Sequence, residues 1–359
     1  MIFRKILFLL NIPFAFLYFI IITLRNGFYT FNIFRKYKIN AKVISVGNIT
    51  WGGTGKTPVA AFIADMLAKK NHRVSILIRG YGNDESELLP KLTSNVPVII
   101  GKDRVKTGIE AVENHLSDTV ILDDGFQHRR LIRDLDIVCI DAAKPFGNGC
   151  VIPAGILREG LGSLKRADMF LITKADLVSG KENMEKLKKK LKAINPKALI
   201  VKSIHRPLYF YKIMNEEKVN IGELKNRELV LVSAIGSPEC FEKTILRLGL
   251  KINKHFIFRD HHRYTKEDIA QIGDYCKKNG LNVLVTTEKD AVKLGKLFPS
   301  RRSPACPEPL DFARDKLRRE TATYEAEKET FDLLVLKVRL EIIENEDGFY
   351  NRLFGIYNS

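Results

Sequence analysis

The chain has 359 residues, of which 45% are hydrophobic, and a formal net charge of +17. This length and apolar content can bury more than one core, which excludes a disordered, fibrous or disulfide-scaffold protein. The positive charge favours polyanionic partners, namely nucleic acid, phosphorylated metabolites or an acidic membrane surface.

An apolar segment opens the chain. Nineteen residues without a charge, 6–24, lie between Lys5 and Arg25. As a helix they would span roughly 28 Å, about one hydrocarbon core. A cleaved signal peptide is the alternative, but the run exceeds a usual apolar region and no small-x-small site follows it. Pro13 can kink the helix, so a segment that lies within one leaflet is a second alternative to a full span. We therefore predict a membrane segment with a basic flank over 1–38. The larger basic cluster follows the segment, which places the rest of the chain in the cytoplasm.

From residue 39 short apolar runs alternate with helical patterns. A Gly-rich loop follows the first run, and a helix is expected from Lys56 to about Lys70. This alternation is typical of an α/β protein with a doubly wound parallel sheet, predicted here over 39–215. The expected buried strands are 41–48, 74–80, 96–100, 119–124, 135–141 and 169–176.

A second, smaller α/β lobe is predicted over 216–300, with strands at 228–235, 251–258 and 281–287. Residues 301–330 contain much arginine and few large apolar residues, which indicates an insertion or linker. A strand-like apolar pattern resumes at 333–342, so 331–359 is predicted as a C-terminal strand and tail that return to the second lobe.

The loop GNITWGGTGKT (47–57) lies between a predicted strand and a predicted helix, where backbone N–H groups can bind a polyphosphate. It misses the strict P-loop pattern by one residue, because Thr50 stands at the first Gly position. Lys56 can reach the β- and γ-phosphates, and the Thr57 hydroxyl suits Mg²⁺. A merely Gly-rich turn is the alternative. The predicted nucleotide-binding residues are Thr50, Trp51, Gly52, Gly53, Thr54, Gly55, Lys56 and Thr57.

Two further segments carry candidate chemistry. Asp123 and Asp124 close a hydrophobic strand, where two uncompensated carboxylates would be costly unless a cation binds there. A strand-end turn with Gly125 is the alternative. In FRDHHRY (258–264) an Asp next to a His can set its tautomer and basicity, although two adjacent histidines on a loop are more often solvent-facing than catalytic.

The chain resembles the tetraacyldisaccharide 4'-kinases, the membrane-associated lipid A 4'-kinases of Gram-negative bacteria. The resemblance runs from residue 1 to about 300 and resumes near 333. Two features depart from the family: the short connection between RGYG and the following NDESELL (83–89), and residues 301–330, which have no counterpart. The motifs that carry the resemblance to this family are SVGNITWGGTGKTP (45–58), RGYG (79–82), GKDR (101–104), ILDDGFQHRRLIRD (121–134), GNGCVIPAGILRE (147–159), DHHRY (260–264) and VTTEKDAVKL (285–294).

The resemblance implies a P-loop NTPase-like fold and transfer of the ATP γ-phosphate to the 4'-hydroxyl of a tetraacylated disaccharide 1-phosphate, giving lipid IVA. Lys56 and Thr57 would bind triphosphate and Mg²⁺. Asp103 would be the carboxylate near the accepting hydroxyl, with His261 as its partner and Asp260 close by.

The same resemblance assigns four more residues. Asp123 and Asp124 would lie on the Mg²⁺ side, and Arg158 and Glu159 would stabilise phosphate and metal. The implied cofactors are ATP and Mg²⁺, and the implied location is the inner membrane, with both catalytic lobes facing the cytoplasm. The substrate would be a lipid-linked disaccharide 1-phosphate, and no obligate protein partner is evident.

Two other functions compete. TKAD (173–176) has the T/N-K-x-D form with which GTPases recognise guanine, so a membrane-anchored P-loop GTPase is the first alternative. A non-catalytic ATP-binding scaffold is the second.

Nucleic acid is not an expected partner, because neither an RNP-type motif nor a helix-turn-helix cue occurs. Nor does the sequence indicate a zinc site. The cysteines lie far apart without C-x-x-C spacing and are expected to be mostly buried thiols in a reducing compartment: Cys139, Cys150, Cys240, Cys276 and Cys306.

Overall fold

The computed structural model describes residues 2–80, 83–93, 95–178, 180–297 and 331–358. The chain forms two compact units: Met1–Arg206 with Leu340–Ser359, and Pro207–Arg339. The tail after Leu340 thus belongs to the first unit, whereas the sequence assigned it to the second lobe. The reason is that β12 (Asp332–Glu344) is long enough to begin in the second unit and end in the first.

The first unit is built on a parallel sheet with the strand order β7-β6-β5-β1-β4-β2-β3. The sequence predicted all of these strands except β7, where Lys202, His205 and Arg206 interrupt the apolar run. The doubly wound parallel sheet is confirmed. Its strands are β1 (Lys42–Gly47), β2 (Val74–Ile78), β3 (Val98–Ile100), β4 (Thr119–Asp123), β5 (Leu135–Asp141), β6 (Met169–Thr173) and β7 (Leu199–Lys212).

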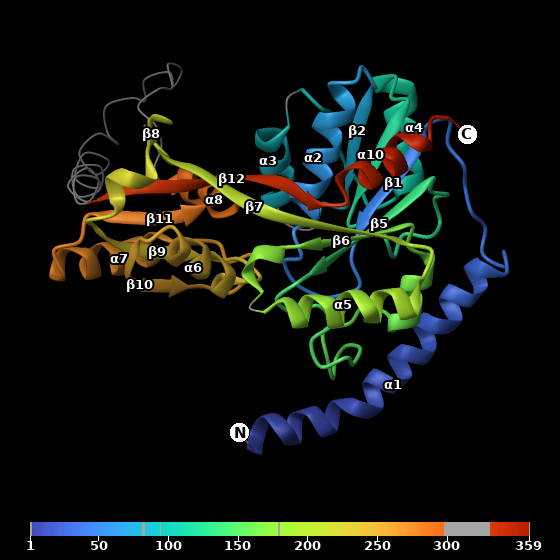
Figure 1. Ribbon diagram of the computed structural model, residues 1–359, viewed down its shortest axis with the longest axis horizontal. Helices are drawn as coiled ribbons and strands as arrows, with labels where there is room; N and C mark the ends of the chain where they lie inside the picture. Colours follow the sequence, from blue (N-terminus) through green and yellow to red (C-terminus); the bar gives the residue numbers. More distant parts are fainter. Residues whose placement is uncertain (1, 81–82, 94, 179, 298–330, 359) are drawn as a thin grey trace, which may run out of the picture. The chain divides into compact units, whose positions relative to one another are not determined.

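Helices cover both faces of this sheet (Figure 1). Because successive strand residues point to opposite faces, Ile44 of β1 packs with the helices on one side and Val43 with those on the other. The first side holds α2 (Lys56–Ala68), α3 (Asn83–Leu92) and α10 (Glu346–Gly355); the second holds α4 (Arg104–His115) and α5 (Lys181–Ile194).

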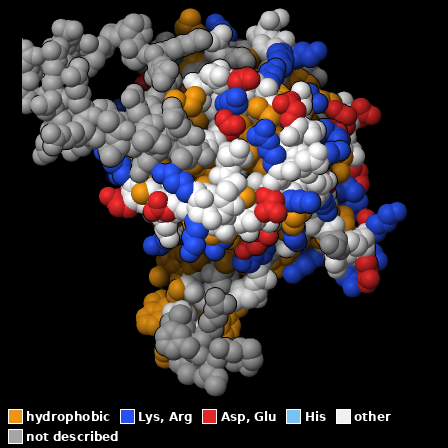
Figure 2. Space-filling view, turned by 90° about the vertical axis from the view of Figure 1, so that its left-hand side faces the viewer, with side chains coloured by type: hydrophobic (Ala, Val, Ile, Leu, Met, Phe, Trp, Pro, Cys, Tyr) orange, Lys and Arg blue, Asp and Glu red, His pale blue; other side chains and the backbone are white. Residues whose placement is uncertain are grey.

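The helix α1 (Ile2–Thr30) precedes the sheet and continues through Pro13. Its part Phe8–Thr30 is long and apolar enough to cross a membrane, a test that signal sequences also pass. Phe14 and Phe16 are each 65% exposed, whereas Ala15 packs into the core that α5 covers. Figure 2 shows the hydrophobic side chains of this helix projecting from the first unit. One side of α1 therefore contacts the protein, and large hydrophobic side chains on the rest of the helix are exposed.

The second unit contains parallel strands in the order β10-β9-β11-β12 and has its own cores. The predicted strands of the second lobe are confirmed, and helices alternate with them. They are β9 (Glu228–Ser233), α6 (Pro238–Arg247), β10 (Lys251–Ile257), α7 (Lys266–Lys278), β11 (Val283–Thr287) and α8 (Glu288–Leu297). The short β8 (Lys218–Val219) pairs antiparallel with the end of β7.

A hydrogen-bonded Ser–His–Glu chain links three elements of the second unit. The Ser233 hydroxyl lies 2.8 Å from Nε2 of His255, whose Nδ1 lies 3.1 Å from Glu242. Ser233 is fully buried at the end of β9, so no substrate can reach its hydroxyl. These two hydrogen bonds therefore connect β9, β10 and α6, and the three side chains do not act as a nucleophilic triad.

Several sequence predictions can be compared only in part. The predicted linker 301–330 and the last two residues of RGYG lie outside the described residues. NDESELL forms most of α3. Of the cysteines, Cys139 and Cys276 are buried, but Cys150 and Cys240 are partly exposed.

Candidate active site

The P-loop lies at the carboxyl end of β1 and leads into α2. Gly55, directly before the helix, has φ 81°, and Gly52 has φ 122°. Both values lie in the left-handed region, where a side chain would be strained, so the glycine spacing is what allows this turn. Because β1 pairs with β4, the loop and the end of β4 lie at the same edge of the sheet.

Asp123, the last residue of β4, contacts the start of α2. The Thr57 hydroxyl donates to its Oδ2 at 2.8 Å. Burial raises the pKa of Asp123, with Lys56 and the Thr57 hydroxyl opposing the rise. Within the described chain its buried Oδ1 accepts no hydrogen bond. A carboxylate oxygen left open beside a hydroxyl fits Mg²⁺, which takes few protein ligands and completes its shell with water and phosphate.

Asp124 is bound by two cations. Arg158 Nη1 donates to both carboxylate oxygens, at 2.9 and 2.7 Å, and Lys56 Nζ lies 3.5 Å away. Burial would raise the pKa of Asp124, but Lys56 and Arg158 outweigh it and hold the pKa below its ordinary value. Asp124 therefore stays ionised and binds both Lys56 and Arg158. Its predicted position on the Mg²⁺ side of the site stays a prediction.

Glu159 is 1% exposed and sits among donors. Arg166 donates to its Oε2 at 2.9 Å and Asn26 of α1 at 2.7 Å. Its Oε1 is buried and accepts no hydrogen bond from any described residue. An open oxygen here is compatible with the predicted metal role of Glu159.

The helix α1 reaches the same segment through a second contact, because Tyr18 donates to the backbone oxygen of Arg158 at 2.8 Å. Sequence reasoning missed Tyr18 and Asn26. The only sequence signal for these two residues was that each places a polar group within a largely apolar helix.

Trp51 and Thr50 of the loop contact the segment that contains Arg158. The Arg158 guanidinium lies over the Trp51 ring, 5.5 Å from its centre, and Thr50 forms a bridge with Leu157. Trp51 is 66% exposed, so its other face is open to a ligand. The predicted nucleotide-binding residues and Arg158 are thus brought together.

Asp103 begins α4 as its N-cap. Its Oδ1 accepts from the backbone N–H of Val105 and Lys106, and its Oδ2 accepts from Arg130 at 2.9 Å. Burial acts to raise the pKa of Asp103, but the two N–H groups and Arg130 together lower it. Arg104, the next residue, is buried and donates to the Asp123 backbone oxygen at 2.9 Å. The sequence reasoning did not single out Arg104, although GKDR contains it.

The histidines of DHHRY have different surroundings in the second unit. His262 stacks on Phe258 and lies 2.7 Å from Asp268, so it is part of the local packing. His261 has a left-handed backbone, φ 63°, and its side chain is 46% exposed. Lys289 of the VTTEKD motif binds Asp260 at 2.9 Å. Asp103 and His261 belong to different units, so their pairing stays a prediction.

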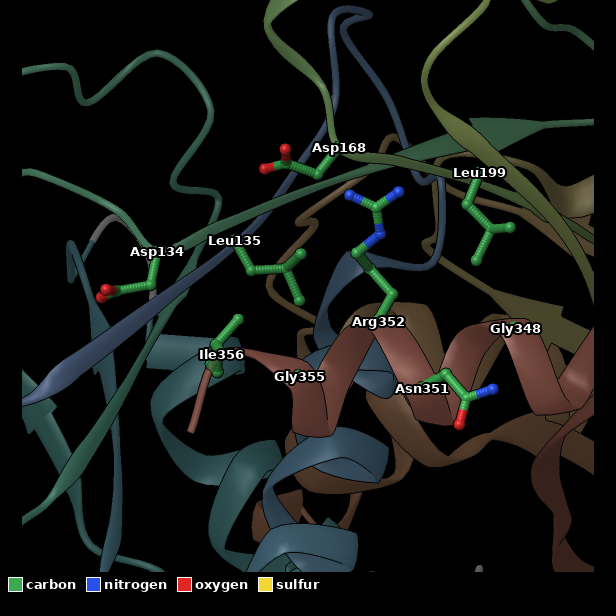
Figure 3. Close-up of a pocket in the computed structure, with 9 residues that line it drawn as sticks. All are labelled: Asp134, Leu135, Asp168, Leu199, Gly348, Asn351, Arg352, Gly355 and Ile356. Atoms are coloured by element: carbon green, nitrogen blue, oxygen red, sulfur yellow. The ribbon is translucent and has the colours of Figure 1, made fainter. Parts of the chain in front are cut away.

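A pocket of about 530 Å³ lies at the other edge of the first sheet. Figure 3 shows Arg352 of α10 extending between Asp168 and Leu199. Leu135 and Leu199 begin β5 and β7, so this pocket is at the amino ends of the strands, opposite the P-loop. In the described part of the chain no group of three or more His, Cys, Asp or Glu side chains could hold a metal by itself.

The sequence of the chain matches the family model of the tetraacyldisaccharide-1-P 4'-kinases, LpxK, over residues 7–320. The chain belongs to this family. It is 37% identical over 313 residues to the tetraacyldisaccharide 4'-kinase of Bdellovibrio bacteriovorus. The matched stretch covers 80% of this chain and 89% of the Bdellovibrio protein. The chain is 39% identical over 297 residues to the enzyme of Elusimicrobium minutum, covering 76% and 78%.

Among solved structures it is similar to the "apo" form of LpxK from Aquifex aeolicus in complex with ATP. The TM-score is 0.69 at 27% identity, and 99% of each chain is covered. The family resemblance read from the sequence motifs is confirmed, as is the fold class.

Proposed function

We propose that this chain transfers the γ-phosphate of ATP to the 4'-hydroxyl of tetraacyldisaccharide 1-phosphate and so forms lipid IVA. The observation that carries the proposal is the P-loop with its Lys56–Asp124–Arg158 cluster, in a member of the tetraacyldisaccharide 4'-kinase family. Relatives at 33–39% identity bear this enzyme name, and the similar Aquifex aeolicus structure holds ATP. The kinase family matches residues 7–320, and a GTPase is not favoured.

The residues supply what phosphoryl transfer needs, namely positioning and neutralisation of charge. The P-loop amides and Lys56 would bind the triphosphate, and Arg158 would contact it from the side of Asp124. Thr57 and Asp123 would hold Mg²⁺, which neutralises charge between phosphate oxygens when bound. Asp103, with His261, would accept the proton of the sugar hydroxyl.

The test is transfer of labelled γ-phosphate to tetraacyldisaccharide 1-phosphate in detergent micelles, with ATP and GTP supplied separately to the full-length protein. We expect a labelled lipid from ATP. Phosphate release from GTP without labelled lipid would instead support the GTPase. A scaffold would turn over neither nucleotide.

Asp123→Asn is expected to raise the Mg²⁺ concentration needed for half-maximal activity by at least about tenfold, because a neutral amide oxygen binds this cation more weakly than a carboxylate. The measurement is lipid phosphorylation against free Mg²⁺ at saturating ATP. Asp134→Asn, at the amino end of β5, is the matched control and should leave the Mg²⁺ dependence unchanged. Equal Mg²⁺ dependence in both variants would reject Asp123 as a ligand.

The apolar helix α1 is proposed to attach the enzyme to the inner membrane, with both lobes in the cytoplasm. An acylated sugar phosphate lies in the bilayer, so its kinase must reach the leaflet. Phe16 and Leu17 are exposed on α1, 65% and 56%, and face no core.

Phe16→Glu with Leu17→Glu is expected to reduce the fraction of full-length protein that floats with anionic vesicles by at least about tenfold, since charges at these depths are costly in lipid. The melting temperature should stay within a few degrees, because both side chains are exposed. Undiminished flotation would show that α1 is not the attachment.

A further inference from the structure

TKAD (173–176), the possible guanine motif, lies against the back of the P-loop. β6 ends at Thr173, whose hydroxyl donates to the Thr54 backbone oxygen at 2.9 Å. Lys174 Nζ donates to the Gly53 backbone oxygen at 2.8 Å. Two consecutive carbonyls of the loop are thus held by two consecutive side chains, one from the last residue of β6 and one from the residue after it.

Lys174 also belongs to a buried ion pair. Its Nζ lies 2.6 Å from Oδ2 of Asp141, the last residue of β5, and the two side chains are 11% and 7% exposed. Asp141 is itself fixed, because its Oδ1 accepts from the backbone N–H of Ala143 at 2.9 Å. A buried ion pair rarely stabilises a protein more than an apolar pair of similar size. The pair is therefore better explained by the position it gives the Lys174 ammonium than by stability.

The order of strands produces this contact. β1, β5 and β6 are neighbours in the sheet, so the ends of β5 and β6 lie beside the loop that follows β1. His205 of β7 packs against the same loop: a Cβ added at Gly55 would lie 3.2 Å from its Cε1. Burial, and then the charge of Lys174, lowers the pKa of His205 to about 4. The ring is neutral at neutral pH and adds no charge beside Lys174.

Each bound carbonyl shares a peptide unit with the N–H of the next residue of the loop. The unit of the Gly53 carbonyl contains the N–H of Thr54, which closes the tight turn by donating to Gly52 at 3.0 Å. The unit of the Thr54 carbonyl contains the N–H of Gly55, directly before α2. A hydrogen bond to a carbonyl polarises the N–H of the same unit and fixes its direction.

We propose that Lys174 is a positioning residue which, with Thr173, holds the P-loop in the conformation whose amides bind the triphosphate of ATP. The role rests on the proposed function, because it concerns the same phosphate site. In this proposal TKAD supports the loop that binds the phosphates of the nucleotide and does not recognise a guanine base.

The test replaces the buried pair with an apolar one, Lys174→Met with Asp141→Leu, in the full-length protein. Removing Lys174 alone would leave Asp141 buried without its cation and could unfold the unit, whereas the double variant keeps a packed pair. We expect a melting temperature within a few degrees of wild type and an ATP dissociation constant, measured by calorimetry without lipid, at least tenfold higher. A folded double variant that binds ATP like wild type would overturn the proposal.

Thr173→Val provides an independent second measurement, because it removes the hydroxyl and keeps the shape. We expect ATP affinity to fall three- to fivefold. The matched control is Thr286→Val in the second unit, where a buried hydroxyl donates to the Val232 backbone oxygen at the same 2.9 Å. It should cost similar stability and leave ATP affinity unchanged. Equal ATP affinity in both variants would count against the role of Thr173.

The two proposals can fail separately. A wild-type chain that phosphorylates no lipid, but whose double variant loses ATP affinity, would contradict the kinase and support the role of Lys174. A wild-type chain that binds GTP more tightly than ATP, with only GTP binding lost in Asp176→Ala, would contradict the proposed role of TKAD.

Discussion

Lys56→Ala is expected to lower kcat for lipid phosphorylation by about 10²–10³-fold, the usual cost of removing one preorganised electrostatic group. Lys56 Nζ lies 3.5 Å from Asp124. After burial, its charge has the largest influence on the pKa of both Asp123 and Asp124, which it lowers. Without Lys56, two carboxylates at the loop would face the incoming triphosphate with less compensation. ATP affinity should therefore fall together with kcat.

The measurement is steady-state transfer of labelled phosphate, with ATP affinity determined separately by calorimetry. Lys69→Ala is the matched control, because Lys69 is exposed at the far end of the same helix. It should retain both kcat and ATP affinity. Full activity in Lys56→Ala would reject the assignment of this loop to the triphosphate.

Asp103→Ala and His261→Ala are each expected to lower kcat by about 10²–10⁴-fold with little change in KM for ATP, as loss of a general base does. If the two residues act as one proton-accepting pair, the double variant should lose no more than the worse single variant. Effects that multiply would mean that the residues act independently. Near-full kcat in both single variants would reject both assignments.

His262→Ala is the control for this pair. His262 stacks on Phe258 and binds Asp268, so its loss should lower the melting temperature and leave kcat of the folded protein nearly unchanged. A large loss of kcat in His262→Ala, with none in His261→Ala, would transfer the role to His262.

Local patterns predicted much of the fold. Apolar runs bounded by turns located six strands of the first sheet, and the same signal located β9, β10, β11 and β12 but not the short β8. β7 was missed because it carries Lys202, His205 and Arg206 within the strand, and this mixed pattern resembles neither a buried strand nor an amphipathic one.

The phosphate site was predictable for a related reason. A P-loop is one continuous segment, and its glycines are required by local backbone angles, so its residues are adjacent in the sequence. Asp123 could be added because a carboxylate at the end of a buried strand is conspicuous. The partners of these residues could not be predicted in this way.

The sequence by itself therefore determined the α/β class, the position of the phosphate loop and the family, all of which depend on short contiguous patterns. The tertiary structure decided which side chains act on that loop. Lys174 reaches Gly53 across 121 residues of chain, and Asn26 reaches Glu159 across 133. These contacts depend on strand order and on the packing of α1. Local hydrophobic periodicity does not encode either, because it specifies which face of an element is buried but not which element covers it.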